Sequence, residues 1–230
     1  MKNKELITIV IVSYKSDKNL LNNLLVKLAP IFKIIIIENS QDESVKIFEK
    51  KYSNVTVDIT EKNNGNGAGI NKGLKLSKTK YSIYMDIDVE ISVDNFFKLI
   101  EEAEKNQDFI MLVPNINSRF KSKEIEKCYD FTGCVMFFNM SEINKVGFFD
   151  ENFFLYFEEI DFAYKCKKLK KNIFLIPSVN LHHIGQSSVK ISSENHKLKS
   201  LREWHFMWSK FYFYKKNFGF FIALIKTFKD

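Results

Sequence analysis

Short apolar runs alternate with stretches of helical leucine spacing over the first ninety residues. The apolar runs, most of them rich in isoleucine and valine, lie at residues 6–12, 34–37, 55–59 and 81–85. Runs of this length predict strands that are buried on both faces. After the first run, leucines recur every three or four positions from Leu20 to Leu28, which is the spacing of an amphipathic helix. The alternation predicts an α/β fold with a mostly parallel central sheet and helices on both faces.

After residue 90 the pattern is less regular but still alternates. We expect a helix around Leu99 and a mobile polar loop at residues 115–127. Further elements are expected as strands at residues 109–113, closed by Pro114, 131–138 and 173–176, and as a helix at residues 159–170. A helical tail of different composition follows. The predicted division is one domain at residues 1–190 and a basic, aromatic tail at residues 191–230.

Two carboxylates one residue apart, Asp86 and Asp88, end the fourth predicted strand. Carboxylate oxygens are hard ligands of the kind that Mg2+ and Mn2+ prefer, and protein-bound Mg2+ commonly shares phosphate oxygens as ligands. The pair therefore suggests a divalent cation that binds a diphosphate. A solvated turn is the alternative for such a pair in isolation. Its position favours the cation site, because open α/β sheets bind ligands at the carboxyl ends of their strands.

A glycine-rich segment at residues 63–73 holds four of the eight glycines of the chain. Glycine lets the backbone approach a ligand closely, and the N-terminus of a following helix favours anions. The segment matches neither a Walker loop nor the dinucleotide fingerprint. A flexible turn is an equal alternative for the loop alone. Glu38, at the end of the second strand, either accepts hydrogen bonds from a nucleoside or caps the next helix.

An acidic cluster, Glu158, Glu159 and Asp161, follows the aromatic run at residues 153–157. The helix dipole alone accounts for acidic residues at a helix start. A carboxylate beside an apolar wall, however, has a raised pKa and suits general-base chemistry. In the pair His182-His183, one imidazole could complete a metal site or contact a diphosphate, the alternative being a surface histidine in a turn.

Taken in order along the chain, these motifs resemble the family 2 glycosyltransferases with the GT-A fold, in particular their rhamnosyltransferase-like branch. The resemblance extends from about Ile7 to Ser188 and makes residues 1–190 the catalytic domain. It rests on residues 9–14, 37–40, 63–73, 86–89, 132–133, 146–151, 156–161 and 182–187.

The resemblance implies inverting transfer of a sugar from a nucleotide-diphosphate sugar, with Mn2+ or Mg2+ bridging the diphosphate. Asp88 is expected to be the main ligand of the cation. Asp86 is directed toward ribose and metal, and His182 is a further ligand. The nucleotide pocket is assigned to Ser13, Tyr14, Glu38, Asn63, Asn71 and Asp86.

The resemblance also assigns the catalytic base, which deprotonates the acceptor hydroxyl. Similar proteins usually read Glu-Asp at this position, whereas this chain reads Glu158-Glu159. The role passes to Glu159, with Glu158 as the second choice, and the extra methylene puts the geometry of the base in doubt. Asp161 is expected to support the helix start or to orient neighbouring groups.

The net charge of +7 and the pI near 9.1 indicate anionic partners. Both tryptophans and many lysines lie in residues 201–230, so this segment is expected to lie on an anionic bilayer. Packing on the domain or in a homodimer is the alternative. Nucleic acid is disfavoured, since no recognition motif is present. No run is long enough to span a membrane, and the three cysteines form no metal or disulfide pattern, which indicates a reducing cytoplasm.

These features lead to the hypothesis of a cytoplasmic enzyme, peripheral on the inner face of a bacterial membrane. It would extend a lipid-linked saccharide in the synthesis of a capsule, O-antigen or other surface polysaccharide. Two competing interpretations are a sugar-phosphate nucleotidyltransferase and a non-catalytic subunit that binds a nucleotide sugar or a membrane. The first lacks its expected glycine-rich, basic signature, because residues 13–16 follow the first strand instead.

Overall fold

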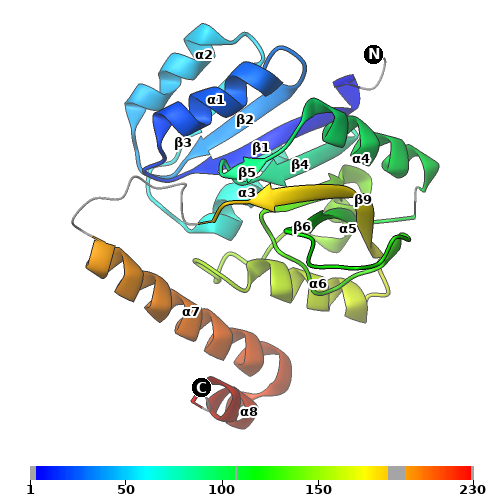
Figure 1. The fold of residues 1–230 in the computed structure, drawn as a ribbon. Helices are drawn as coiled ribbons and strands as arrows, with labels where there is room; N and C mark the ends of the chain where they lie inside the picture. Colours follow the sequence, from blue (N-terminus) through cyan, green and yellow to red (C-terminus); the bar gives the residue numbers. More distant parts are fainter. Residues whose placement is uncertain (1–3, 107, 186–194, 229–230) are drawn as a thin grey trace.

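The computed structural model describes residues 4–106, 108–185 and 195–228, without the side chains of residues 195–198. A twisted central sheet lies between layers of helices, and two C-terminal helices lie along one side (Figure 1). The strands are β1 (Ile7–Ser13), β2 (Lys33–Glu38), β3 (Val55–Ile59), β4 (Tyr81–Met85), β5 (Val89–Glu90), β6 (Met111–Ile116), β7 (Glu126–Lys127), β8 (Val135–Asn139) and β9 (Ile173–His183). The helices are α1 (Lys18–Leu28), α2 (Ile47–Lys51), α3 (Asn66–Leu76), α4 (Val93–Lys105), α5 (Met140–Val146), α6 (Glu158–Lys168), α7 (Asn195–Phe218) and α8 (Phe220–Thr227), with short 3-10 helices at Lys4–Leu6 and Glu43–Lys46.

The N-terminal half of the sheet is parallel and matches the predicted pattern. Strands β3, β2, β1 and β4 are neighbours in that order, and Ser13 lies opposite Glu38 in the register of β1 with β2. The parallel register brings the carboxyl ends of β1, β2 and β4 to one edge. The predicted α/β fold with a mostly parallel sheet and helices on both faces is confirmed.

The second half of the sheet is mixed. Strand β8 runs antiparallel to both β4 and β6, whereas β9 is parallel to β6. The prediction that Pro114 closes its strand is wrong, because the backbone continues to Ile116 after a register shift between Pro114 and Asn115. Such a bulge accommodates a residue that donates no ladder hydrogen bond. Strand β9 likewise continues beyond the predicted end at residue 176, as far as His183.

Two separate apolar clusters cover the two faces of the sheet. One contains Leu25 of α1 and Leu99 of α4, packed on residues such as Ile9 of β1. The other contains Leu74 of α3 and Phe162 of α6. Alternating residues of a strand point to opposite faces, so a continuously apolar strand such as β1 supplies both clusters.

The C-terminal helices α7 and α8 pack on each other and beside the layers of sheet and helices. Phe213 of α7 joins Phe153 and Phe157 in a third apolar cluster. Of the helices that the structure describes, none is both long and apolar enough to cross a bilayer. Helices α7 and α8 form the predicted helical tail, and α7 contacts the loop that precedes α6.

Candidate active site

A cavity of about 560 Å3 lies at the carboxyl ends of β1 and β4. Tyr14 and Asn63 line it from the parallel half of the sheet, and Asp86 lies just after β4. Glu159, in the first turn of α6, lines it as well. Residues of four separate chain segments therefore converge on one space that is large enough for a small ligand.

Asp86, Asp88 and His183 form a compact acidic and imidazole group in this cavity. Each offers one ligand atom, and these atoms all lie within 4.8 Å of one another. His183 Nε2 lies 3.1 Å from Asp88 Oδ1 and 3.8 Å from Asp86 Oδ2. Burial raises the pKa of Asp86 to about 6, and the hydrogen bond to Asp88 raises the pKa of His183. The two carboxylates suit Mn2+ or Mg2+, and the imidazole adds a nitrogen ligand of the kind that transition metals accept.

The pairing of β5 with β9 brings His183, and not His182, to the carboxylates. In this antiparallel register Val89 lies opposite His183. His182 is exposed, and its Nδ1 lies 2.9 Å from Asn117 Oδ1. Neighbouring residues of a strand point to opposite faces, so only one of the two histidines can face the cavity. The expectation that His182 lies beside Asp86 and Asp88 is therefore corrected to His183.

A chain of hydrogen bonds joins the carboxylates after β4 to the start of α6. The Tyr84 hydroxyl donates to Asp86 Oδ1 and also lies 3.3 Å from Asn66 Oδ1. Asn66 Nδ2 in turn donates to Glu158 Oε1 at 2.8 Å. The sequence analysis did not single out Tyr84. The strand alternation could have done so, because Tyr84 stands two residues before Asp86 and shares its face of the chain.

The two glutamates of α6 differ in their surroundings. Glu158 is 5% exposed, and its Oε2 has no hydrogen-bond partner among the described residues. Glu159 lines the cavity beside Gly133, where a Cβ atom would lie 3.0 Å from Glu159 Cγ. Burial, and secondarily the charge of Glu158, raises the pKa of Glu159 to about 8. The glycine thus leaves the space that the longer glutamate side chain occupies.

The backbone before these glutamates is strained. Tyr156 and Phe157 have φ angles of 67° and 69°, in the left-handed region that aromatic residues rarely adopt. Phe157 is also the N-cap of α6 and makes no side-chain capping hydrogen bond. Strain of this kind persists where the surrounding structure enforces it, and it clusters at functional sites.

The residues predicted to bind the nucleotide are not all brought together. Tyr14 and Asn63 line the cavity, whereas Ser13 and Glu38 are buried at the strand ends behind it. Glu38 Oε1 accepts a hydrogen bond from the backbone N–H of Ser40 at 2.6 Å.

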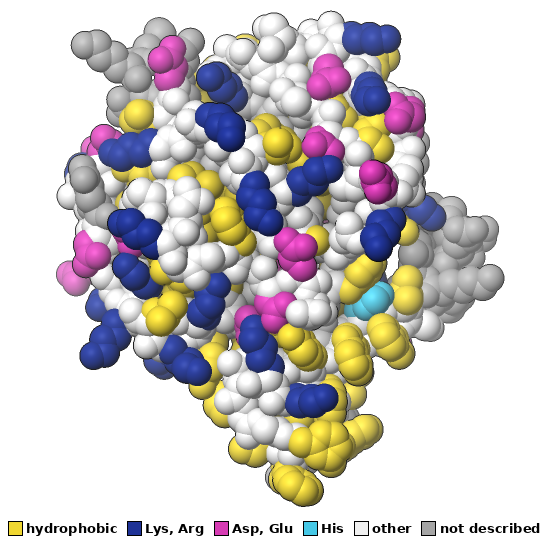
Figure 2. Space-filling view, turned by 180° about the vertical axis from the view of Figure 1, so that it is seen from behind, with side chains coloured by type: hydrophobic (Ala, Val, Ile, Leu, Met, Phe, Trp, Pro, Cys, Tyr) yellow, Lys and Arg dark blue, Asp and Glu magenta, His cyan; other side chains and the backbone are white. Residues whose placement is uncertain are grey.

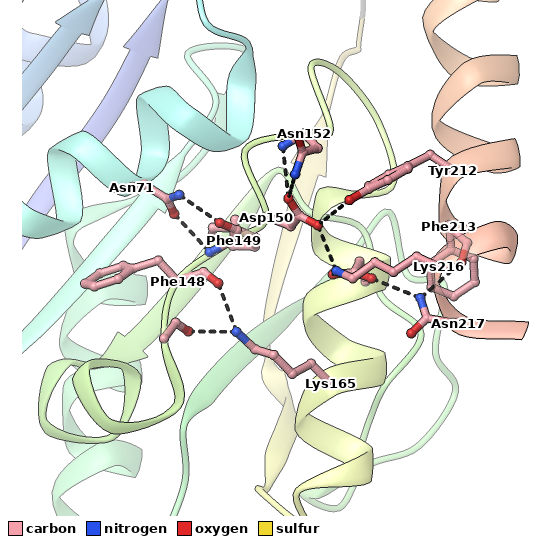
Figure 3. Close-up of polar contacts among 12 residues, drawn as sticks. Asn71, Phe148, Phe149, Asp150, Asn152, Lys165, Tyr212, Phe213, Lys216 and Asn217 are labelled. Atoms are coloured by element: carbon pink, nitrogen blue, oxygen red, sulfur yellow. Dashed lines mark hydrogen bonds and ion pairs between the residues drawn. The ribbon is translucent and has the colours of Figure 1, made fainter.

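Asn71, also predicted at the nucleotide, lies outside the cavity lining. It is buried, and its side-chain amide forms two hydrogen bonds with the backbone of Phe149 (Figure 3). Oδ1 accepts from the Phe149 N–H at 3.0 Å, and Nδ2 donates to the Phe149 carbonyl oxygen at 2.9 Å. The structure therefore places Asn71 as a tether between α3 and the loop that precedes α6.

Helix α7 supplies a wall of the same cavity. Leu201, Arg202 and His205 line it, and the ring of His205 stacks on Phe154 with centroids 4.4 Å apart. The composition of this helix led to the prediction of a membrane-associated tail, with packing on the domain or in a homodimer as the alternative. No local pattern in the sequence indicates that its first turns reach the cavity, because that arrangement depends on tertiary packing.

A second acidic cluster fixes α7 to the loop before α6 (Figure 3). Lys216 Nζ lies 2.8 Å from Asp150 Oδ2 and 2.7 Å from Asp161 Oδ2. Tyr212 donates to Asp150 Oδ2 at 3.0 Å, and Asn217 donates to Asp161 Oδ1 at 3.1 Å. Although burial alone would raise it, the hydrogen bonds to Asp150 hold the pKa of that carboxyl at about 2. Asp161 therefore supports the helix from a position directed toward α7.

The model of the family described as "Glycosyl transferase family 2" matches residues 8–175. The low-salt glycan biosynthesis hexosyltransferase Agl10 of Haloferax volcanii is 20% identical over 200 residues, which cover 73% of this chain and 63% of that protein. Among solved structures, GalNAc-T7 with UDP, GalNAc and Mn2+ has a TM-score of 0.66 at 16% identity, covering 94% of this chain and 52% of the other.

Two structures of a Staphylococcus aureus protein are similar as well. TarS has a TM-score of 0.63 at 17% identity and covers 90% of this chain and 38% of the other. Its residues 1–349 in complex with UDP-GlcNAc have a TM-score of 0.60 at 19% identity, covering 86% and 66% of the two chains. At these identities the solved structures show a shared GT-A fold. The chain spans less than two thirds of the length of Agl10 and about half of that of GalNAc-T7.

Proposed function

The chain belongs to glycosyl transferase family 2, and from this we propose that it moves a sugar from a nucleotide-diphosphate sugar to a hydroxyl of a saccharide acceptor, with inversion at the anomeric carbon. The observation that carries the proposal is the convergence of a metal-ligand group and a glutamate with a raised pKa on one cavity. UDP or UDP-sugar is present in several structures of similar fold, which supports a nucleoside diphosphate donor.

Asp86, Asp88 and His183 would hold the divalent cation. A cation bound there would act as a Lewis acid that offsets the negative charge developing on the leaving nucleoside diphosphate. The hydrogen bond from Tyr84 orients Asp86, and the pairing of β5 with β9 orients His183. Residues outside the ligand group therefore fix the positions of the ligand atoms.

Glu159 is the residue we assign as catalytic base. Its carboxylate accepts the proton of the acceptor hydroxyl while that oxygen forms a bond to the anomeric carbon. The bond from the anomeric carbon to the β-phosphate oxygen breaks, and its electron pair leaves with the nucleoside diphosphate. Glu158 is less suited to this role, because Asn66 binds its carboxylate and only 5% of the residue is exposed.

Tyr14 and Asn63 would contact the nucleoside part of the donor. Gly65 has a φ of 98°, and a Cβ atom there would lie 2.3 Å from the carbonyl oxygen of Phe154. Only glycine permits this conformation and this close approach. The glycine-rich loop is thereby held against the segment that carries Glu159, which closes one side of the cavity.

The acceptor we propose is a lipid-linked saccharide, with the protein peripheral on a membrane. Apolar side chains gather over the end of the molecule where α7 and α8 lie (Figure 2). The exposed ones are Leu201, Trp204, Phe206, Met207, Trp208, Phe218, Phe220, Phe221, Ile222, Ile225 and Phe228. Trp204 and Trp208 stack at 6.1 Å, and basic residues such as Lys215 and Lys226 lie among them. Such a surface fits the interface of an anionic bilayer, and a saccharide acceptor is consistent with the similarity to Agl10, a hexosyltransferase of low-salt glycan biosynthesis.

Liposome flotation tests the membrane part of the proposal. Trp208 and Phe221 are 46% and 79% exposed, so changing both to serine should weaken binding to vesicles with anionic lipid while leaving the fold intact. Unchanged flotation together with a concentration-dependent dimer in solution would assign the surface to a second copy of the chain instead.

A panel of UDP-, GDP- and dTDP-sugars with Mn2+ or Mg2+ tests the activity itself. We expect one donor to be hydrolysed slowly without acceptor and faster with it, and the rate to require the cation. Binding of a donor without turnover, even with acceptor present, would support a non-catalytic subunit.

A further inference from the structure

We propose that Arg202 of α7 binds a phosphate group in the cavity, which makes α7 a working part of the active site and not only a tail. This inference rests on the proposed function. It arises from the charge of the cavity, the position of Arg202 on its helix, and the contacts that fix the helix.

The described residues lining the cavity contribute four carboxylates, those of Asp86, Asp88, Glu158 and Glu159. Among these lining residues, Arg202 is the single lysine or arginine. A nucleoside diphosphate is strongly anionic, and a divalent cation at Asp86 and Asp88 offsets only part of the repulsion from the carboxylates. A positive charge from the protein would therefore favour binding of a phosphate in this cavity.

Arg202 is available for this role. It forms no ion pair with any carboxylate in the part of the chain that the structure describes, and it is half-buried. A guanidinium group stays protonated and presents several donors in a plane, which matches the oxygens of a phosphate. Burial lowers the pKa of the neighbouring His205, so that imidazole is neutral near pH 7 and does not supply the charge.

The helix holds Arg202 in place. Arg202, Ser209 and Lys216 are seven residues apart, and this spacing puts them on one face of α7. On that face, Ser209 Oγ donates to the carbonyl oxygen of Leu155 at 2.8 Å, and Lys216 binds both Asp150 and Asp161. The face that anchors the helix to the loop before α6 is thus the face that presents Arg202 to the cavity.

The phosphate could belong to the donor or to the lipid diphosphate of the acceptor. The test measures binding of UDP, GDP and dTDP, and of the corresponding nucleosides, by calorimetry in the presence of Mn2+. The proteins are the wild type, R202Q and R202K, with K98Q as a control that removes one positive charge from the exposed surface of α4. Donor and acceptor KM values are measured for the same four proteins.

If the phosphate is that of the donor, R202Q should weaken binding of the nucleoside diphosphate about ten- to a hundredfold and leave the nucleoside unaffected, with partial recovery in R202K. If it is that of the acceptor, the KM for a lipid-diphosphate acceptor should rise by a similar factor while nucleotide binding stays unchanged. The proposal is overturned if neither changes, or if diphosphate and nucleoside weaken equally. A wild type that binds a nucleoside diphosphate but turns over no donor would contradict the proposed function alone.

Discussion

Two acidic clusters lie near the start of α6, and their carboxylates have different partners. In the cavity, Tyr84 donates a hydrogen bond to Asp86, Asn66 donates one to Glu158, and His183 Nε2 lies 3.1 Å from Asp88 Oδ1. The anchor carboxylates, Asp150 and Asp161, share Lys216. The pKa of Asp86 and of Glu159 is raised, whereas the pKa of Asp150 is lowered.

The difference supports the proposal that the cavity cluster binds a cation, whereas the other cluster holds a helix. Burying a carboxylate is costly unless a cation or hydrogen bonds compensate it. The anchor carboxylates obtain that compensation from α7 and serve to hold the helix. In the cavity, Asp86 and Glu158 accept hydrogen bonds from the neutral groups of Tyr84 and Asn66, and a bound cation would add a positive charge like the one that Lys216 supplies to the anchor carboxylates. Proximity to the same helix start therefore does not give the two clusters the same role.

The largest expected effect is on catalysis by Glu159. E159Q should lower kcat by about a hundred- to ten-thousandfold, because the amide cannot accept the acceptor proton. E61Q, an exposed glutamate on the loop after β3, serves as the control and should keep the wild-type rate. Retention of full kcat in E159Q would remove the residue from the mechanism and return attention to Glu158.

The pH dependence of kcat also tests the role of Glu159. A general base must be ionised, and the pKa of Glu159 is about 8, so kcat should rise as the pH increases from 6 to 9. A rate that falls over this range, measured at saturating donor and constant Mn2+, would show that another group limits the reaction.

A smaller loss is expected from the metal-ligand group. D88N should reduce cation-dependent kcat/KM about a hundredfold or more, because it removes a charged ligand of the cation. Mn2+ should raise the Tm of the wild type and not that of the variant, since only a ligand bound to the folded state stabilises it. Asp150→Asn provides the contrast from the other cluster and should keep the Mn2+ effect. Full activity of D88N would refute its assigned role.

Substitutions in the anchor cluster, Asp150, Asp161 and Lys216, should change the free energy of unfolding. K216M leaves Asp150 and Asp161 without their shared cation, and because 34% of the Lys216 side chain is exposed, the loss should lie between the values for exposed and buried pairs, at about 2 kcal/mol. The neighbouring Lys215 is exposed, so K215M is the matched control and should unfold at nearly the wild-type urea concentration. Equal stability of the two variants would show that the anchor contributes nothing measurable.

The sequence predicted the parallel half of the sheet and the carboxylate pair because both depend on local patterns. Continuous apolar runs identify β1 to β4, and Asp86 is the first residue after β4. The choice between His182 and His183 depends on the register of β9 with β5, which follows a bulge that no local pattern reveals.

The contribution of α7 to the cavity was not predictable for a related reason. The aromatic and basic composition of the tail suggests a surface, and most of its aromatic residues are indeed exposed. Its inward face is identified only by partners far away in sequence, such as Leu155 for Ser209 and Asp161 for Lys216. The functional roles assigned to Glu159, Asp88 and the nucleotide residues stay predictions until the experiments above are done.

The smallest expected effect is the loss of unfolding free energy at low pH that comes from protonation of Asp150. The pKa of Asp150 is about 2 in the folded protein against an ordinary value of 3.8, so its ionised form stabilises the fold above pH 4, by about 1 kcal/mol once solvent screening of this partly exposed pair is allowed for. This contribution is lost as the pH falls through 3.8 toward 2, and about half of it should be gone at pH 3. The difference in unfolding free energy between the wild type and D150N should therefore narrow between pH 5 and pH 3, as measured by urea titration. A difference that stays constant over this range would mean that Asp150 acts through shape and not through its charge, and the contrast between the two clusters would then lose its electrostatic basis.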